Sequence, residues 1–211
     1  MRRVSIYIVR HGETDLNATR VVQLPTTPLS AGGRAQAQRV AARLAGRDVG
    51  QILSSDMVRA AETAAAIAAR TGAAVVQDPA LRERNFGDLC GTPYAEHTSN
   101  IFAPGYEPPG GESWEVFWDR VAIAWQRIVD ASRATNGRDL VVVTHGLVCH
   151  AILDRHVHYT DLAPERWHNT SVTELDHAPP WTPRVVNCVA HLDAMDGDVG
   201  IMQSDDFSGP V

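Results

Sequence analysis

Short and almost continuously apolar segments recur along the chain, separated by longer segments in which apolar residues are spaced as on one face of a helix. Residues 4–9 (VSIYIV) and 140–146 (LVVVTHG) begin with the uninterrupted apolar runs that are typical of strands buried in a parallel sheet. Four further segments predict strands, two in the first half of the chain and two near its end. They cover residues 51–55, 73–77, 171–176 and 185–193.

Four segments between these strands carry apolar residues at helical spacing. Ser30, Asp56 and Ser113 are residue types that cap the N-termini of helices, and Gly72 is of the type that ends them. The sequence therefore predicts helices from residue 31 to about 46, from 57 to 71, from 114 to about 137 and from 147 to 157.

The predicted elements follow the order β-α-β-α-β, then a long loop, then α-β-α-β-β. This alternation predicts an α/β fold of three layers, α/β/α, with a mostly parallel sheet. Residues 91–112 are rich in Pro and Gly and predict a loop with at most one short helix, and such loops often serve as functional lids. We expect one domain over residues 1–194 and a loose acidic tail over residues 195–211.

Composition narrows the functions that such a domain can have. The 211 residues carry a net charge of −6, which argues against a nucleic-acid or anionic-membrane partner, so an anion would have to bind in a local pocket. All 19 basic residues are arginines. The absence of lysine excludes a P-loop lysine, a Schiff base and a lysine general base.

The cysteines and the apolar segments indicate where the protein acts. Cys90, Cys149 and Cys188 are odd in number and widely spaced, which fits a reducing compartment better than a disulfide framework or a zinc site. The N-terminal apolar run is too short for a signal peptide, and no segment is long enough to span a bilayer. We therefore expect a cytoplasmic protein with no membrane partner.

Two of the predicted strands end in a histidine followed by a glycine. His11 and Gly12 follow Arg10 at the end of the first strand, and His145 and Gly146 follow the strand that begins at residue 140. Ligands of parallel sheets bind beyond the carboxyl ends of the strands, so both histidines are expected at one edge of the sheet. Arginine beside them indicates an anionic ligand, because its planar fork can meet two phosphoryl oxygens.

Five segments together resemble the histidine phosphatase superfamily, the phosphoglycerate mutase-like proteins. They are RHGETDLNATRVVQ, SSDMVRAAETA, LRERNFGDLCG, GGES and THG, and their order and spacing fit the family from Val4 to about Asp193. The resemblance implies a phosphoglycerate mutase-like fold, a histidine-phosphatase-like catalytic domain over residues 1–194 and a reaction through phosphohistidine.

The resemblance implies a role for each of five residues. His11 stands at the position of the nucleophile, which attacks phosphorus only as a neutral imidazole whose other nitrogen holds its proton. Arg10 and Arg59 stand at the phosphate-clamping positions, and His145 at that of a second histidine that donates a hydrogen bond to the phosphoryl group. Glu83 matches the general acid. Burial would favour the protonated form of this carboxyl, and the two arginines would oppose it.

Three further residues match positions that contact the substrate in the family. Asn17 and Gln23 would line the pocket, although either could be an ordinary loop cap. Gly146 begins a helix whose unpaired backbone N–H groups favour an anion. Arg84 follows the acid directly and has two interpretations, a substrate contact or a surface position.

Departures from the mutase pattern favour a phosphatase branch of the family. Residues 85–119 contain no Lys or Arg, and Leu147 stands where mutases have an asparagine. A compact, cation-free lid fits the hydrolysis of a small, partly apolar phosphorylated metabolite without a cofactor. Cofactor-dependent phosphoglycerate mutase-type phosphoryl transfer is the alternative. Leu24, Leu89 and Cys90 also depart from the family pattern and leave the substrate open.

Other classes of function compete with this interpretation. The segment of residues 145–158 contains histidines and a carboxylate that could form the zinc site of a metal-dependent hydrolase. Much of this segment is predicted to be one helix, on which His150 and Asp154 merely share a face, and this disfavours the zinc site. The residues concerned are His145, His150, Asp154, His156 and His158. A non-catalytic phosphate-binding regulator is disfavoured because the catalytic set is intact, and we expect no bound metal. The sequence does not decide between a monomer and a homodimer.

Overall fold

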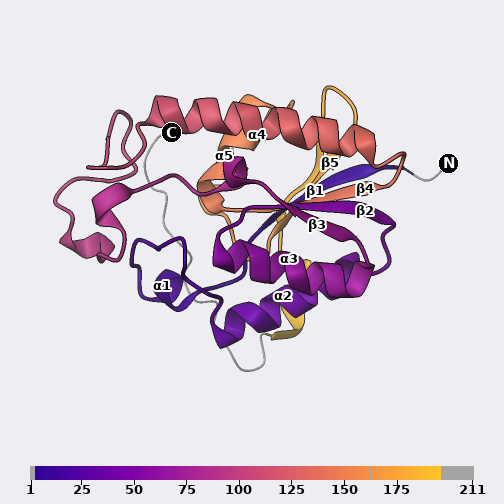
Figure 1. Cartoon of the computed structure of the whole chain (residues 1–211), viewed down its shortest axis with the longest axis horizontal. Coiled ribbons are helices and arrows are strands. Elements are labelled where there is room, and N and C mark those ends of the chain that lie inside the picture. The colour runs from indigo at the N-terminus through magenta and orange to yellow at the C-terminus, as the bar shows by residue number, and fades with distance from the viewer. Residues whose placement is uncertain (1–2, 162, 196–211) are drawn as a thin grey trace.

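The computed structural model describes residues 3–161 and 163–195 and contains a six-stranded sheet (Figure 1). The strand order is β3-β2-β4-β1-β5-β6, in which the first four strands are parallel and the last two antiparallel to their neighbours. The α/β fold with a mostly parallel sheet is therefore confirmed. The strands are β1 (Ser5–Arg10), β2 (Val49–Ser54), β3 (Ala74–Gln77), β4 (Asp139–Thr144), β5 (Val172–Asp176) and β6 (Pro183–Cys188).

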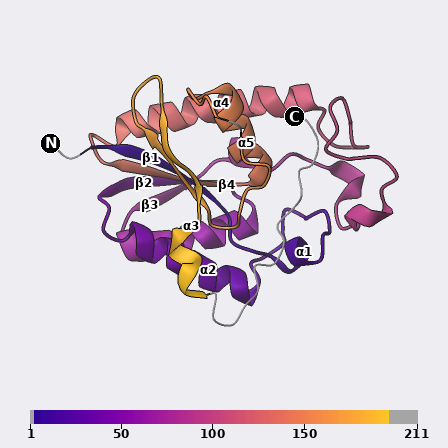
Figure 2. The ribbon, with the colours of Figure 1, turned by 180° about the vertical axis from the view of Figure 1, so that it is seen from behind.

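Helices cover both faces of the sheet, as the two opposite views show (Figures 1 and 2). Two helices, α2 and α3, lie against one face, and α4 and α5 lie against the other. A single turn of helix, α1, lies in the loop after β1 and was not predicted. The helices are α1 (Asp15–Ala18), α2 (Ala31–Leu44), α3 (Val58–Thr71), α4 (Trp114–Ala134) and α5 (Gly146–Arg155).

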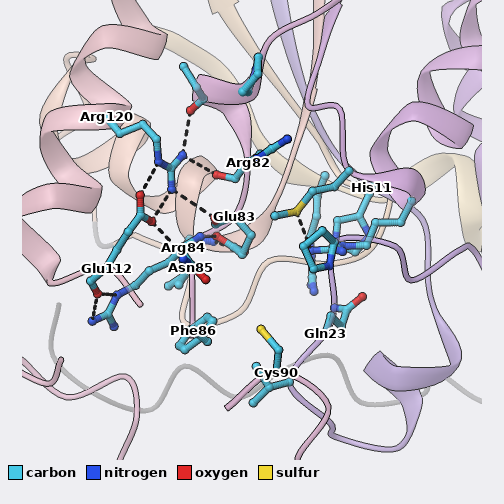
Figure 3. Close-up of a pocket in the computed structure, with 18 of the residues that line it drawn as sticks. His11, Gln23, Arg82, Glu83, Arg84, Asn85, Phe86, Cys90, Glu112 and Arg120 are labelled. Atoms are coloured by element: carbon cyan, nitrogen blue, oxygen red, sulfur yellow. Dashed lines mark hydrogen bonds and ion pairs between the residues drawn. The ribbon is translucent and has the colours of Figure 1, made fainter. Parts of the chain in front are cut away.

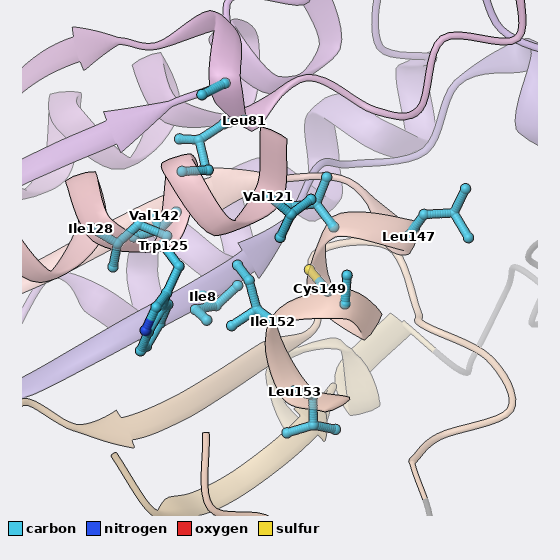
Figure 4. Packing of buried hydrophobic residues seen from close by; sticks show 14 of the residues in the cluster. Ile8, Leu81, Val121, Trp125, Ile128, Val142, Leu147, Cys149, Ile152 and Leu153 are labelled. Carbon is cyan, nitrogen blue, oxygen red and sulfur yellow. The ribbon is translucent and has the colours of Figure 1, made fainter. Parts of the chain in front are cut away.

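The alternating side chains of β1 and β4 divide the core into two layers. Ile8 and Val142 face α4 and α5 (Figure 4), whereas Val9 and Val143 face α2 and α3. Helices cover both sides of β1 and β4. The central residues of these strands are therefore apolar without interruption, and this apolar run is the pattern that predicted them from the sequence.

Most predicted helix boundaries agree with the structure. Ser30 and Ser113 accept hydrogen bonds from backbone N–H groups in the first turns of α2 and α4, and Gly72 ends α3 with a φ of 71°. The prediction that Asp56 caps α3 is wrong: Met57 holds the cap position without a side-chain bond. The Asp56 carboxylate instead accepts hydrogen bonds from the guanidinium of Arg82.

The last predicted strand, over residues 185–193, is partly wrong. Strand β6 ends at Cys188, which pairs with Val172, the first residue of β5. Beyond Cys188 the neighbouring strand has no residue left to pair with, and the chain forms a 3₁₀ helix over Ala190–Met195. The predicted tail lies outside the described residues apart from its first residue, Met195. Among the described residues, no helix has the length and apolarity to cross a membrane.

Parallel pairing brings the two predicted histidine sites together. In the β1–β4 register, Val9 pairs with Val143 and Arg10 pairs with Thr144. His11 and His145 are the next residues of these adjacent strands, and the backbone N–H of His11 donates to the carbonyl of Thr144 at 2.9 Å. The sheet therefore holds the two imidazoles side by side at its carboxyl edge.

We expect Gly33→Ala to destabilise the protein. A Cβ at Gly33, in the first turn of α2, would lie 1.9 Å from the carbonyl oxygen of Glu13 in the segment that follows His11. Overpacking of this kind costs about 1–3 kcal/mol and outweighs the higher helix propensity of alanine. Gly46→Ala is the matched control, because nothing lies within 4 Å of its added Cβ. Equal free energies of unfolding for the two variants, measured in urea, would contradict the expectation.

Candidate active site

The His11 imidazole is held in the form that a nucleophile needs. Its Nδ1 lies 2.7 Å from the Gly12 carbonyl oxygen, to which only a protonated Nδ1 can donate. Its Nε2 therefore carries no proton and accepts from Nε of Arg59 at 3.2 Å. The ring is 1% exposed, and burial together with Arg59 and Arg10 lowers the pKa of His11 well below its usual value. His11 is thus neutral and unprotonated at Nε2, whose lone pair is held by Arg59 here and must be released by Arg59 before Nε2 can bond to another atom.

Arg10 and Arg59 bring two cationic groups to the same edge of the sheet. Both are only 2% exposed. Arg59, in the first turn of α3, also donates to the carbonyl oxygen of Leu24 at 3.0 Å, and Arg10 donates to the carbonyl oxygen of Trp167. These bonds fix the guanidinium groups beside His11, where they favour an anion.

His145 lies beside His11, with 5.1 Å between the ring centroids. Its Nε2 lies 2.9 Å from the hydroxyl oxygen of Ser55, and its buried Nδ1 has no hydrogen-bond partner among the described residues. Burial, Arg59 and the other nearby cationic groups lower the pKa of His145 well below its usual value. The ring is therefore neutral and can donate only one hydrogen bond.

Glu83 lies at the N-terminus of α5. One carboxyl oxygen accepts from the backbone N–H of Leu147 at 3.2 Å, and the other accepts from the N–H of Arg84 at 3.0 Å. Burial raises the pKa of Glu83, and this effect exceeds the opposing effects of the two N–H groups and of Arg59 and Arg10. The two opposing effects foreseen from the sequence are thereby ranked, with burial the larger.

These groups meet at a pocket of about 740 Å³ (Figure 3). Arg10, His11, Arg59 and Glu83 line one part of it, and Gln23 lines the wall nearby. A second part of the lining is apolar or aromatic and comes largely from the loop that precedes α4. It consists of Val22, Phe86, Cys90, Tyr94, Phe102 and Leu147.

Three predicted site residues do not line this pocket. His145 is fully buried beneath it, and Gly146 lies in the first turn of α5. Asn17 is buried in α1, where its side-chain oxygen accepts from Asn169 at 3.4 Å. Gln23, which does line the pocket, accepts from the hydroxyl of Thr14 at 2.8 Å. Asn17 and Gln23 thus both take part in contacts that hold the loop after β1.

Of the two positions expected for Arg84, the surface position is wrong: Arg84 is buried and lines the pocket, where a substrate contact stays a prediction. Its side chain is buried, and its guanidinium donates to the carbonyl oxygens of Ile101, Tyr106 and Glu112 in the lid loop. It also lies 4.0 Å from the ring centroid of Trp114. The guanidinium of Arg84 therefore holds together the loop of residues 91–112, which the sequence predicts to be a lid.

An ion pair that the sequence analysis missed fixes the backbone around Glu83. Arg120 in α4 donates two hydrogen bonds of 2.7 Å to the carboxylate of Glu112 and others to the carbonyl oxygens of Ala80, Arg82 and Glu83. Figure 3 shows Arg120 and Glu112 on the side of Glu83 remote from His11. The glutamate of the GGES segment was the only sequence signal for this contact.

The residues of the alternative metal site are not brought together. His145 lies beside His11, whereas His156 stacks on Trp125 at 5.9 Å between ring centroids. In the part of the chain that the structure describes, no group of three or more His, Cys, Asp or Glu side chains is arranged to hold a metal ion.

The chain belongs to the histidine phosphatase superfamily (branch 1), whose family model matches residues 6–187. It is 39% identical over 215 residues to phosphoglycerate mutase-like protein 4 of Arabidopsis thaliana, covering 94% of this chain and 90% of that protein. It is 30% identical over 208 residues to the probable phosphoglycerate mutase GpmB of Serratia proteamaculans, covering 90% and 95% of the two chains.

Solved structures show the same fold. The structure of mycobacterial glucosyl-3-phosphoglycerate phosphatase in complex with VO3 matches with a TM-score of 0.75 and 28% identity, over 89% of this chain and 100% of that chain. The superfamily consists of enzymes with phosphatase or mutase activity, so both activities are open to this site.

We expect stability to fall in acid because of the two buried histidines. Their pKa values are lowered in the folded state, so below about pH 6.5 the unfolded chain binds more protons than the folded chain. Each histidine then removes about 1.4 kcal/mol of stability per pH unit, down to its folded-state pKa. Between pH 6.5 and 5, the free energy of unfolding measured in urea should fall less steeply for the double variant His11→Asn/His145→Asn than for the wild type. A slope equal to that of the wild type would refute this assignment.

Proposed function

We propose that this protein is a phosphatase that hydrolyses small-molecule phosphate monoesters through a phosphohistidine at His11. The observation that carries the proposal is the state of His11. Its Nδ1–H is held by the Gly12 carbonyl, and its unprotonated Nε2 lies next to Arg59 in a pocket that Arg10 also lines. This arrangement supplies a nucleophile and two cationic groups for a phosphoryl group.

The proposed reaction has two steps. In the first, Nε2 of His11 forms a bond to phosphorus, the bond from phosphorus to the ester oxygen breaks, and Glu83 gives its proton to that oxygen, so the alcohol leaves. In the second, water attacks phosphorus, Glu83 takes up a proton from the water, and inorganic phosphate leaves His11. The raised pKa of Glu83 favours the acid form that the first step requires.

The pocket walls favour hydrolysis of a partly apolar substrate over phosphoryl transfer between phosphoglycerates. No Lys or Arg lies between Arg84 and Arg120, and Arg84 itself is bonded to lid carbonyls. Apart from Arg10 and Arg59, which lie beside His11, the remaining arginines that line the pocket are each paired with a carboxylate. These pairs are Arg82 with Asp56, Arg120 with Glu112 and Arg127 with Asp78.

The mutase alternative rests on two relatives whose names include phosphoglycerate mutase. The phosphatase proposal has a counterpart in the mycobacterial phosphatase. We further propose that the reaction needs no metal, because arginines supply the positive charge, and that it takes place in the cytoplasm. The three cysteines are free thiols in the structure, which suits a reducing compartment.

Turnover should leave a phosphate on His11. With a small phosphate monoester as substrate, acid-labile and base-stable phosphoenzyme should be trapped from the wild type by rapid quenching and should be missing from His11→Ala. Activity should persist in EDTA. Loss of activity in EDTA that zinc restores would refute the metal-independent mechanism.

The protein should hydrolyse phosphate monoesters faster than it interconverts the phosphoglycerates. We expect inorganic phosphate to be released from a panel of monoesters, with faster release from partly apolar ones, because Phe86, Tyr94 and Phe102 line the pocket. Coupled assays with 3-phosphoglycerate should show little 2-phosphoglycerate, with or without the bisphosphate. Robust interconversion stimulated by the bisphosphate would establish the mutase alternative.

Glu83→Gln should act selectively on poor leaving groups. General acid catalysis is worth about 10²–10⁴-fold, so we expect a loss of that order in kcat/KM on alkyl phosphates. The comparison is made in kcat/KM because this quantity reports formation of the phosphohistidine, whereas kcat also includes the second step, in which Glu83 acts on water whatever the leaving group. The loss on p-nitrophenyl phosphate should be far smaller, because its phenolate leaves without protonation. Glu96→Gln, an exposed position in the lid loop, is the matched control. Equal losses on both substrate types would show that Glu83 positions the phosphate and that another group is the acid.

A further inference from the structure

Ser55 is placed by the sheet against the second histidine of the site. It follows β2, whose neighbour in the sheet is β4, and its backbone N–H donates to the carbonyl oxygen of Val143 at 2.9 Å. Its side chain is fully buried, and its hydroxyl oxygen lies 2.9 Å from Nε2 of His145. The position of this hydroxyl therefore depends on the same strand pairing that positions the histidines.

The hydrogen bonds of Ser55 determine the direction of this contact. A hydroxyl has one proton to donate and two lone pairs. The Ser55 oxygen already accepts from the backbone N–H of Met57 at 3.2 Å. Among the described residues, the structure offers one acceptor for the proton of the Ser55 hydroxyl, and this acceptor is Nε2 of His145. The buried hydroxyl is thus fully satisfied only if it donates to Nε2.

A neutral imidazole that accepts at Nε2 must carry its proton on Nδ1. In His145 this Nδ1 is the buried nitrogen without a partner among the described residues, on a ring 5.1 Å from that of His11. A phosphoryl group on His11 offers only acceptor oxygens. With the opposite tautomer, Nδ1 would have no proton to donate to those oxygens, and the Ser55 proton would be left without an acceptor.

We propose that Ser55 is a positioning residue that holds His145 in the Nδ1–H tautomer, so that Nδ1 donates to the phosphoryl group during transfer. This inference deepens the proposed function and rests on it for its catalytic part. Ser55 itself does not touch the phosphoryl group. It acts through His145, and its effect should disappear when His145 is absent.

The tautomer can be measured without turnover. Long-range ¹H–¹⁵N NMR spectra of the ¹⁵N-labelled full chain at pH 7.5 distinguish the two neutral tautomers, and His145→Ala identifies the signals. We expect the Nδ1–H form in the wild type and a shift towards the Nε2–H form in Ser55→Ala. Ser54→Ala is the matched control, because this equally buried hydroxyl donates to the carbonyl of Ser55 and not to His145. An Nε2–H tautomer in the wild type would overturn the proposal.

Kinetics on a small phosphate monoester test the consequence. Loss of one donor aimed at a developing charge lowers kcat by about 10²–10³, and Ser55 acts through such a donor, so we expect a roughly tenfold lower kcat in Ser55→Ala with little change in KM. In the His145→Ala background the same change should alter kcat by less than about twofold. A tenfold loss in both backgrounds would show a merely structural role. If the wild type hydrolysed no monoester, the proposed function would fail while the tautomer result stood.

Discussion

The parallel pairing of β1 with β4 is the constraint on which the site depends. Its register places Arg10 opposite Thr144, and the next residue of each strand is a histidine. Pairing of β2 on the other side of β4 adds Ser55, which contacts the second of these histidines. A shift by one residue would turn every side chain of β1 to the opposite face. The apolar layers on both faces of the sheet therefore fix the catalytic geometry as well as the fold.

Burial also sets the protonation states at this edge of the sheet. Removal from water disfavours charge on any group, so it lowers the pKa of His11 and His145 and raises that of Glu83. The nearby Arg59 and Arg10 lower the pKa of both histidines further. One environment thus favours the uncharged form of all three groups, and the proposed nucleophile, hydrogen-bond donor and acid each require that form.

The sequence predicted the sheet and the main helices because their apolar periodicity and their caps are local signals. It placed His11 and His145 at one edge because both follow buried strands. It failed for the cap assigned to Asp56 and did not predict the loop carbonyls that Arg84 binds, because these partners lie in segments distant along the chain: Asp56 pairs with Arg82, and Arg84 binds the carbonyl of Ile101. No local pattern specifies such partners. For the same reason the contact between Arg120 and Glu112 was not predicted, although both residues belong to regions whose secondary structure was predicted well.

Glu83 and Arg84 are consecutive residues whose side chains bind different parts of the structure. Glu83 lies at the pocket and accepts from the first turn of α5, whereas Arg84 holds the carbonyl groups of the lid. One peptide unit thus joins Glu83 to the loop that forms the apolar wall of the pocket. If Glu83 is the proton donor, as proposed, a ligand that displaced this loop would also displace the proton donor. Selectivity among substrates would then be expressed in the rate of bond cleavage, because poorly fitting molecules would bind without being turned over efficiently.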